Sequence, residues 1–341
     1  MLSVPQLANY AEGLGGLVAA GLFIFGLKRM SSPVSAPRGI KTAGIGMVIA
    51  VLAAFLVLAN LPPAIGHRVT GNLALALAAL ALGGGWAVWS GRRVEMTAMP
   101  QMVALYNGMG GGAAAAIAAA ECVHGLGTGV VLATVTLAGG LIGSVSFTGS
   151  IIAWAKLDGR MERAVRFRNQ KWINGAVFLV AILLGLLDIY LLSEGYAAGF
   201  TIVLFFIAAL VFGVMMTLPI GGADMPVVIS LYNAFTGLAV GLEGYALGNP
   251  ALMIAGMVVG SAGTLLTVLM AKAMNRSLAN VLFSNFGDVS LAGSSEVTGQ
   301  MKPAEAADAA IAMRYASSVI IVPGYGLAVA QAQQKLYEFV K

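Results

Sequence analysis

Two asparagines stand inside long apolar stretches, and each follows a proline at the same distance. Asn107 lies seven residues after Pro100, and Asn233 lies seven residues after Pro226. An amide at membrane depth needs hydrogen-bond partners and usually faces a bundle interior or a wet cavity. Together with two serine hydroxyl groups, these amides are candidates for a hydrogen-bonded proton path, which comprises Asn107, Asn233, Ser144 and Ser150. Serine also bonds its own helix backbone in membranes, so a packing role is the alternative for each hydroxyl.

A second polar landmark is the short segment Gly221-Gly222-Ala223-Asp224-Met225-Pro226. In one interpretation Asp224 caps the following helix, because a carboxylate accepts backbone N–H bonds and favours the positive end of the helix dipole. The two glycines before it favour a second interpretation, in which this turn is a surface that another domain contacts. The sequence leaves both interpretations open.

A glycine turn near residue 324 is typical of a dinucleotide-binding fold. Residues 318–322 predict a buried strand, and Gly324-Tyr325-Gly326 opens a predicted helix that runs to residue 341. Glycines between a strand and a helix let the backbone approach a pyrophosphate at the helix N-terminus. Val329 occupies the position of the third glycine. Only the first strand and helix of a doubly wound domain are predicted, so we do not expect this part to hold a dinucleotide by itself.

The elements that must hold the asparagines are membrane helices. Of the 341 residues, 59% are hydrophobic and 10% are charged, whereas soluble domains are about 45 to 50% apolar and about 25% charged. A water-soluble globule of this size is therefore excluded. Stretches of about 20 apolar residues predict transmembrane helices. Nine such stretches occur, at 7–27, 40–60, 69–90, 100–122, 129–155, 172–192, 199–219, 225–248 and 250–271.

Positive charges give the predicted orientation, because Lys and Arg accumulate in short cytoplasmic loops. Alternate connections hold nearly all of them, with the largest group at 156–171, and the opposite connections hold only Arg68. We therefore expect the N-terminus outside and the C-terminus in the cytoplasm. The basic run indicates topology, with contact to anionic lipid headgroups as the alternative, and no nucleic-acid partner is expected. His67, His124 and the single Cys122 do not form a pattern typical of a metal site.

The sequence also predicts an internal duplication. Ala138-Gly139 and Gly143-Ser144 match Ala255-Gly256 and Gly260-Ser261, in the stretches that follow the two asparagine stretches. We expect predicted helices 3 to 5 and 7 to 9 to form two related units, as in many transporters, where the site lies between repeats. The expected fold is an α-helical integral membrane domain of nine helices at 1–275, then a linker at 276–302. Residues 303–341 are the expected incomplete start of a Rossmann-like α/β domain.

With these residues in view, the chain resembles the beta subunit of the proton-translocating nicotinamide nucleotide transhydrogenases. The segments that carry the resemblance span residues 94 to 333 in the family's order. They are VEMT at 94–97, the Met99-Pro100 helix start, FTGS at 147–150, IGGADMPVV at 220–228, KAMNRS at 272–277 and PGYGLAVAQAQ at 323–333. Residues 1–93 match only in hydrophobic character.

The resemblance implies a proton-conducting membrane domain and a cytoplasmic NADP(H)-binding domain, in a bacterial inner membrane. A separate alpha subunit would bind NAD(H), and two copies of each subunit would assemble. This Si/Re-specific enzyme would need both subunits, and inward proton movement would drive hydride transfer from NADH to NADP+. No catalytic side chain is expected, because the hydride chemistry belongs to the cofactors. The implied cofactor contacts are Gly324, Tyr325, Gly326, Ala328 and Val329, and the implied coupling contacts are Asp224, Gly222 and Arg276.

One residue departs from the family's pattern. Many members carry a histidine, regarded as the proton carrier, where this chain has Asn107. An amide does not titrate near neutral pH, whereas histidine does. We favour a titratable group on another helix, for example from the partner subunit, and water held by Asn107 and Asn233 is the other interpretation. The alternative functions are a secondary ion or solute transporter with a same-direction repeat, and a nucleotide-sensing membrane scaffold.

Overall fold

The computed structural model describes residues 4–58, 66–124, 129–161, 165–196, 198–275, 277, 305–324, 327, 330 and 332–341. The chain divides into two compact units, Met1–Asp288 and Val289–Lys341.

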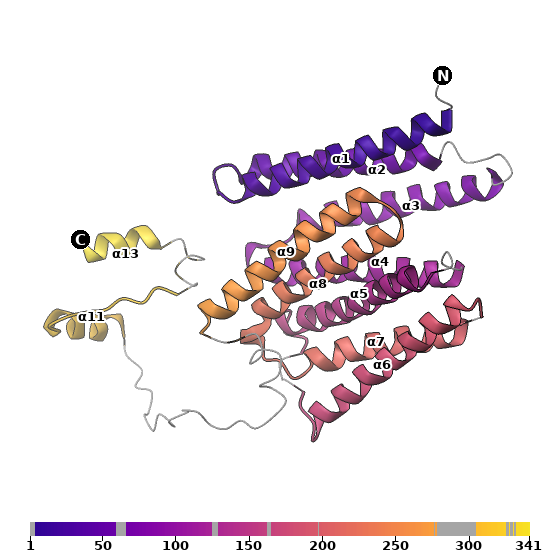
Figure 1. Ribbon diagram of the computed structural model, residues 1–341. Helices are drawn as coiled ribbons and strands as arrows, with labels where there is room; N and C mark the ends of the chain where they lie inside the picture. Colours follow the sequence, from indigo (N-terminus) through magenta and orange to yellow (C-terminus); the bar gives the residue numbers. More distant parts are fainter. Residues whose placement is uncertain are drawn as a thin grey trace. The chain divides into compact units, whose positions relative to one another are not determined.

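The first unit consists of long helices that lie side by side (Figure 1). They are α1 (Val4–Met30), α2 (Ala36–Leu58), α3 (Gly66–Gly91), α4 (Met99–His124), α5 (Val130–Leu157), α6 (Gln170–Ser193), α7 (Gly199–Thr217), α8 (Met225–Ala246) and α9 (Pro250–Ala273). In the part of the chain that the structure describes, nine helices are long and apolar enough to cross a membrane. The nine predicted spans are therefore confirmed.

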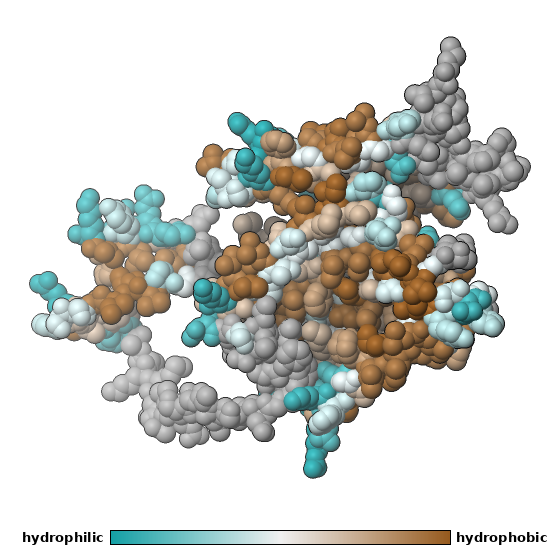
Figure 2. Space-filling model, viewed as in Figure 1, coloured by the Kyte–Doolittle hydropathy of each residue, from teal (hydrophilic) through white to brown (hydrophobic). Residues whose placement is uncertain are grey.

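The surface of this unit is that of a protein surrounded by lipid. Figure 2 shows hydrophobic residues over most of its visible face, with hydrophilic residues gathered toward the helix ends. Large apolar side chains such as Leu82, Trp172 and Phe200 are about three-quarters exposed. Such exposure is costly in water but favourable in hydrocarbon, where helices satisfy all their backbone hydrogen bonds internally.

Helices α5 and α8 form the centre of the unit. Half of the residues in the spans of α5 and α8 are buried, whereas the span of α3 has no buried residue among those described. Helix α5 packs on α4, α7 and α8, and α8 packs on α9 and α4. Tyr232 and Val228 of α8, with Val145 of α5, belong to one buried apolar cluster. Polar groups on these two helices are thus the ones withdrawn from lipid.

Glycines allow the central helices to pack with their backbones in contact. A Cβ added to Gly111 of α4 would lie 2.9 Å from the Gly143 oxygen of α5, and one added to Gly237 of α8 would lie 2.8 Å from Gly260 Cα of α9. Real Cβ atoms do not approach so closely, so larger residues do not fit at these crossings. Small interface residues serve this purpose in many membrane helices.

Helices α4 and α8 begin in the same way. A short 3-10 turn precedes each, η2 (Met96–Ala98) before α4 and η3 (Gly222–Asp224) before α8. In each case the helix then starts with Met-Pro. Proline suits the first helical turn because its missing N–H would have no intrahelical acceptor there.

The second unit differs from the prediction. Its described helices are α11 (Ala306–Tyr315) and α13 (Gln333–Val340), and its described residues include no strand. Residues 318–322 are without a ladder partner, and Ile320 and Val322 are 87% and 85% exposed. The predicted buried strand is therefore wrong for this chain, and the Rossmann start is not seen. The physical reason is that a strand depends on hydrogen bonds to a neighbour, and no described segment of this unit supplies one.

Candidate functional site

A hydrogen bond joins the asparagine of α4 to a serine of α5. Asn107 Nδ2 donates to Ser150 Oγ at 2.9 Å. Asn107 is half-buried and Ser150 is fully buried. Gly108 and Gly111 line the same crossing, where a Cβ on Gly108 would lie 3.1 Å from Ser150 Cβ. The close approach of the two backbones brings the short serine hydroxyl within reach of the amide.

Two further hydroxyl groups connect this pair to α8. Ser146 Oγ lies 2.9 Å from the backbone oxygen of Tyr232 and 2.6 Å from Thr236 Oγ1. Thr236 Oγ1 in turn lies 3.4 Å from the backbone oxygen of Asn107. Helices α4, α5 and α8 therefore meet at one polar level inside the bundle.

The Ser146 and Thr236 hydroxyls have two possible arrangements, because each carries a single proton. In one, Ser146 donates to the backbone oxygen of Tyr232 and Thr236 donates to Ser146. In the other, Ser146 donates to Thr236, and Thr236 donates to the backbone oxygen of Asn107. The pair can reverse its direction by rotating two hydroxyl groups while the heavy atoms remain in place. This is the property required of a segment that passes a proton.

Two of the predicted path residues lie apart from this network. Asn233 is half-buried and has no hydrogen bond to the described residues, while Ser144 is fully buried and its Oγ has no partner among them. The Ser144 backbone oxygen accepts from Thr148. The structure thus brings Asn107 and Ser150 together, and it connects α4 to α8 through Thr236 rather than through Asn233.

Sequence reasoning missed Ser146 and Thr236. The signal was present, because Ser146 precedes Ser150 by four residues and Thr236 follows Asn233 by three. Residues at these spacings share a helix face. Ser144 and Thr148 lie on another side of α5, where the Thr148 hydroxyl donates to the Leu210 oxygen of α7 at 2.9 Å.

A buried lysine holds the connection between α7 and α8. Lys156 Nζ, near the end of α5, donates to the backbone oxygens of Thr217, Leu218 and Ile220 at 2.6 to 2.9 Å. The Thr217 and Leu218 carbonyl groups lie at the C-terminal end of α7, where a cation also favours the negative end of the helix dipole. The Thr217 hydroxyl lies 2.6 Å from the Tyr232 hydroxyl. The segment before α8 is therefore tied to the same tyrosine whose backbone oxygen contacts Ser146.

The acidic turn before α8 directly follows the segment whose carbonyl groups this lysine binds. Asp224 occupies the N-cap position of α8, with φ −89° and ψ −6°, and its side chain makes no capping hydrogen bond. The capping interpretation is therefore wrong in its specific form, because an N-cap carboxylate reaches the helix N–H groups from an extended backbone. Asp224 is buried and Gly222 is exposed.

Other predicted site residues are placed only in part. Gly324 is exposed, with open space around its Cα. Arg276, Tyr325, Gly326, Ala328 and Val329 lie outside the described residues. Within the described ranges, no group of three His, Cys, Asp or Glu side chains could hold a metal ion.

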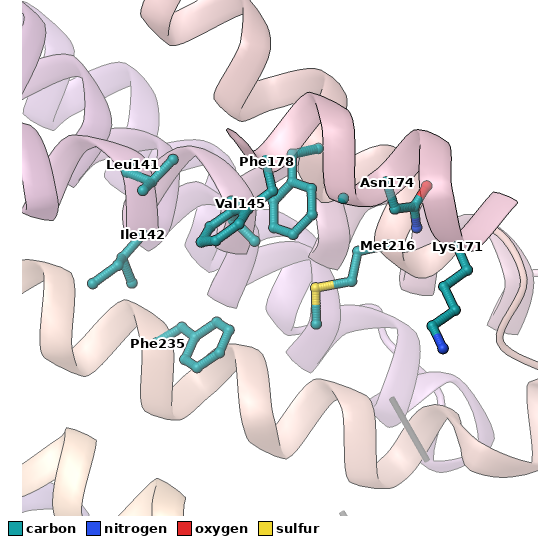
Figure 3. A pocket seen from close by; sticks show the side chains of 10 residues that line it. Leu141, Ile142, Val145, Lys171, Asn174, Phe178, Met216 and Phe235 are labelled. Atoms are coloured by element: carbon teal, nitrogen blue, oxygen red, sulfur yellow. The ribbon is translucent and has the colours of Figure 1, made fainter. Parts of the chain in front are cut away.

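A cavity of about 570 Å³ lies between α5, α6, α7 and α8 (Figure 3). Leu141, Val145, Phe178 and Phe235 contribute to its walls, and Lys171 is its charged lining residue. An apolar lining suits an acyl chain or an apolar side chain and does not suit a dinucleotide.

Comparison with known proteins identifies the family of this chain. The family model for the NAD(P) transhydrogenase beta subunit matches residues 13–341. This chain belongs to that family. Two curated proteins named "NAD(P) transhydrogenase subunit beta", one from Rhodospirillum rubrum and one from a named strain of that species, are each 38% identical over 334 residues. These alignments cover 94% of this chain and 69% of each relative.

Family membership confirms the resemblance seen in the sequence. A transhydrogenase beta subunit is an enzyme subunit, the family's substrates are NAD(P), and the designation beta implies an alpha partner. The membrane unit described above is thus the membrane part of a transhydrogenase subunit.

Proposed function

We propose that this chain couples inward proton movement to hydride transfer from NADH to NADP+, as the beta subunit of a proton-translocating transhydrogenase. The observation that carries the proposal is the polar connection between helices α4, α5 and α8. It comprises the Asn107 side chain bonded to Ser150, the Thr236 and Ser146 hydroxyls between the backbone oxygens of Asn107 and Tyr232, and the Tyr232 hydroxyl bonded to Thr217. Polar groups at membrane depth mostly face a bundle interior or a water-filled cavity, as these do, and a proton route needs such groups.

The same connection supplies a route for coupling. Lys156 binds the carbonyl groups of the segment that leads to Gly222 and Asp224. A displacement of that segment would move Thr217 against Tyr232 and so favour one of the two hydroxyl arrangements of Ser146 and Thr236. Nucleotide occupancy would then act by stabilising one of two states of the membrane domain. Asp224, Gly222 and Arg276 remain the proposed contacts with the NADP(H) domain.

The remaining parts of the proposal follow from the family and from the charges. We assign NADP(H) to the domain that begins near residue 303 and contains Gly324, Tyr325, Gly326, Ala328 and Val329, and we assign NAD(H) to the alpha subunit. NAD(P) cofactors supply the hydride chemistry, and this chain supplies binding and the proton route. We assign the N-terminus to the outer side of a bacterial inner membrane and the C-terminus to the cytoplasm, because Lys and Arg accumulate in short cytoplasmic loops. The assembly would be a dimer of alpha and beta pairs.

The test uses the complete beta subunit, co-expressed with its alpha subunit and reconstituted into liposomes. An interior pH dye reports proton movement while external NADPH reduces an NAD analogue. We expect proton movement only when both nucleotides are present, and omission of either nucleotide is the control. Ion movement that needs no nucleotide, without hydride transfer, would contradict the proposal and favour a secondary transporter.

A further inference from the structure

The hydroxyl and amide groups of the central network cannot store a proton, because none of them titrates near neutral pH. A proton path built only from Asn107, Ser146, Ser150 and Thr236 therefore lacks a group that can load. The described residues of α4, α5 and α8 contain one fully buried carboxyl group, that of Glu243 in the last two turns of α8.

Glu243 is withdrawn from lipid and lacks the partners that a structural carboxylate requires. Its side chain is 1% exposed, and neither carboxyl oxygen has a hydrogen-bond partner among the described residues. Burying an ionised carboxylate without a partner is costly. The negative end of the α8 dipole adds to this cost. An acid in this place is therefore unsuited to stabilising the fold and suited to carrying a proton.

The carboxyl group faces the interface between α8 and α5. Gly139 of α5 makes room for it, since a Cβ on Gly139 would lie 3.1 Å from Glu243 Cδ. Along α5, Gly139 lies two turns before Ser146, and along α8, Thr236 lies two turns before Glu243. Seven residues correspond to about 10.5 Å of helix rise and return to the same face. Glu243 thus lies on the same face of α8 as Thr236, and Gly139, which it contacts, lies on the same face of α5 as Ser146. Both are toward the other end of the bundle from Lys156.

The surrounding titratable groups are acids and a thiol. Glu121 on α4 lies within electrostatic range of Glu243, and Cys122 on α4 lies within range of Glu243 and of Asp188 on α6. Asp188 is also fully buried, and its carboxyl oxygens have no hydrogen-bond partner in the described part of the chain. The nearby Thr201 hydroxyl donates to the Ala198 oxygen. No described cation neutralises Glu243, so a proton is the cation that fits this carboxyl group.

We propose that Glu243 is the proton-loading residue of the membrane domain, exchanging a proton between the outer side and the network of Thr236, Ser146 and Asn107. The proton binds a carboxylate oxygen of Glu243 and later leaves it, with no other bond made or broken. This inference rests on the proposed function. It also names, within this chain, a titratable group on a helix other than the one that carries Asn107.

Three variants of the complete alpha and beta complex in liposomes test the inference. Glu243→Gln keeps the shape and removes the titration, Glu243→Asp keeps a titratable group, and Asp188→Asn is the matched control for a buried acid without a partner. We expect Glu243→Gln to slow nucleotide-driven proton movement about a hundredfold, the usual effect of losing a proton-transfer group. We expect Asp188→Asn to stay within about twofold of the wild-type protein. Nucleotide-driven proton movement at the wild-type rate in Glu243→Gln would overturn the inference.

The pH dependence of Glu243→Asp provides the second readout, which remains useful if Glu243→Gln fails to assemble. We expect this variant to transport protons with a rate-against-pH curve displaced from that of the wild-type protein, because the shorter acid sits in a different environment. An undisplaced curve at the wild-type rate would overturn the inference. Failure of the wild-type complex to move protons with both nucleotides would instead overturn the proposed function, so the two failures are distinguishable.

Discussion

Two helix pairs in this protein follow one sequence pattern and differ in their polar contacts. Helices α4 and α5 are in close contact at Gly111 and Gly143, and helices α8 and α9 are in close contact at Gly237 and Gly260. Each of the first glycines lies four residues after the asparagine of its helix. The glycines at these shared positions therefore allow both helix pairs to pack closely, although the polar contacts of the two pairs differ.

The polar residues at equivalent positions are different. The positions in α9 that correspond to Ser146 and Ser150 hold Gly263 and Thr267, and the position in α4 that corresponds to Thr236 holds Gly110. Asn107 bonds Ser150, whereas Thr267 bonds Ser230 at 3.0 Å. The same backbone arrangement thus supports a polar contact between three helices at α4, α5 and α8, and a contact within one pair at α8 and α9. Single side chains, more than the helix packing, decide where a proton route can exist.

The largest expected effect comes from breaking the shared glycine packing. Gly237→Leu would place a side chain against the backbone of Gly260, and overpacking typically costs about 1 to 3 kcal/mol and occasionally more. We expect the variant to lose its folded complex, measured as the yield and melting temperature of the purified protein in detergent. Gly44→Leu on α2 is the control, because a Cβ there meets nothing within 4 Å. Equal stability of the two variants would show that the crossing is not tightly packed.

The second largest effect is expected at Lys156, which joins α5 to the segment between α7 and α8. Lys156→Met removes the donor to three carbonyl groups, and leaving buried acceptors without a donor costs about 1 to 3 kcal/mol. We expect a lower melting temperature, and fewer protons moved per hydride transferred in liposomes. Lys272→Met, an exposed lysine in the last turn of α9, should leave both quantities unchanged. An unchanged ratio of protons to hydride in Lys156→Met would refute the coupling route.

A smaller effect distinguishes the two helix pairs directly. Ser146→Ala removes the contacts to the Tyr232 oxygen and to Thr236, each worth about 1 kcal/mol. We expect proton movement to fall by at least about tenfold, equivalent to about 1.4 kcal/mol on the barrier, because the variant lacks a hydroxyl group that the proposed route requires. Thr267→Ala breaks the contact with Ser230 between α9 and α8 and should cost similar stability without slowing proton movement. Equal losses of transport in both variants would mean that the two pairs do not differ in function.

The smallest effect is expected at the tyrosine of α8. Tyr232→Phe removes only the hydroxyl contact with Thr217, and a single buried hydrogen bond contributes about 1 kcal/mol. Thermal unfolding should show a slightly lower melting temperature. Tyr106→Phe, at the equivalent position of α4, removes a hydroxyl that contacts Ser90 on an exposed surface. It should change the melting temperature less, and the reverse order would contradict the assignment of Tyr232 to the core.

The sequence predicted the membrane helices well because their signal is local. Twenty apolar residues predict a span wherever its neighbours lie, and the starts of α4 and α8 coincide with Met99 and Met225. The contact of Asn107 with Ser150 depends on how two helices are rotated about their axes, which only their packing determines. Thr236 and Glu243 were missed for the same reason. The strand predicted at 318–322 failed because a strand requires a partner that local patterns do not reveal.

Proton movement in the Asn107→Leu variant tests the central claim most directly. Leucine is close to asparagine in size but cannot donate to Ser150, and in the complete alpha and beta complex the variant's proton movement would be compared with that of Asn233→Leu. The account predicts that Asn107→Leu abolishes nucleotide-driven proton movement, while Asn233→Leu, which breaks no hydrogen bond to the described residues, retains a measurable rate. Proton pumping at the wild-type rate in Asn107→Leu would contradict the account, because the path would then run elsewhere.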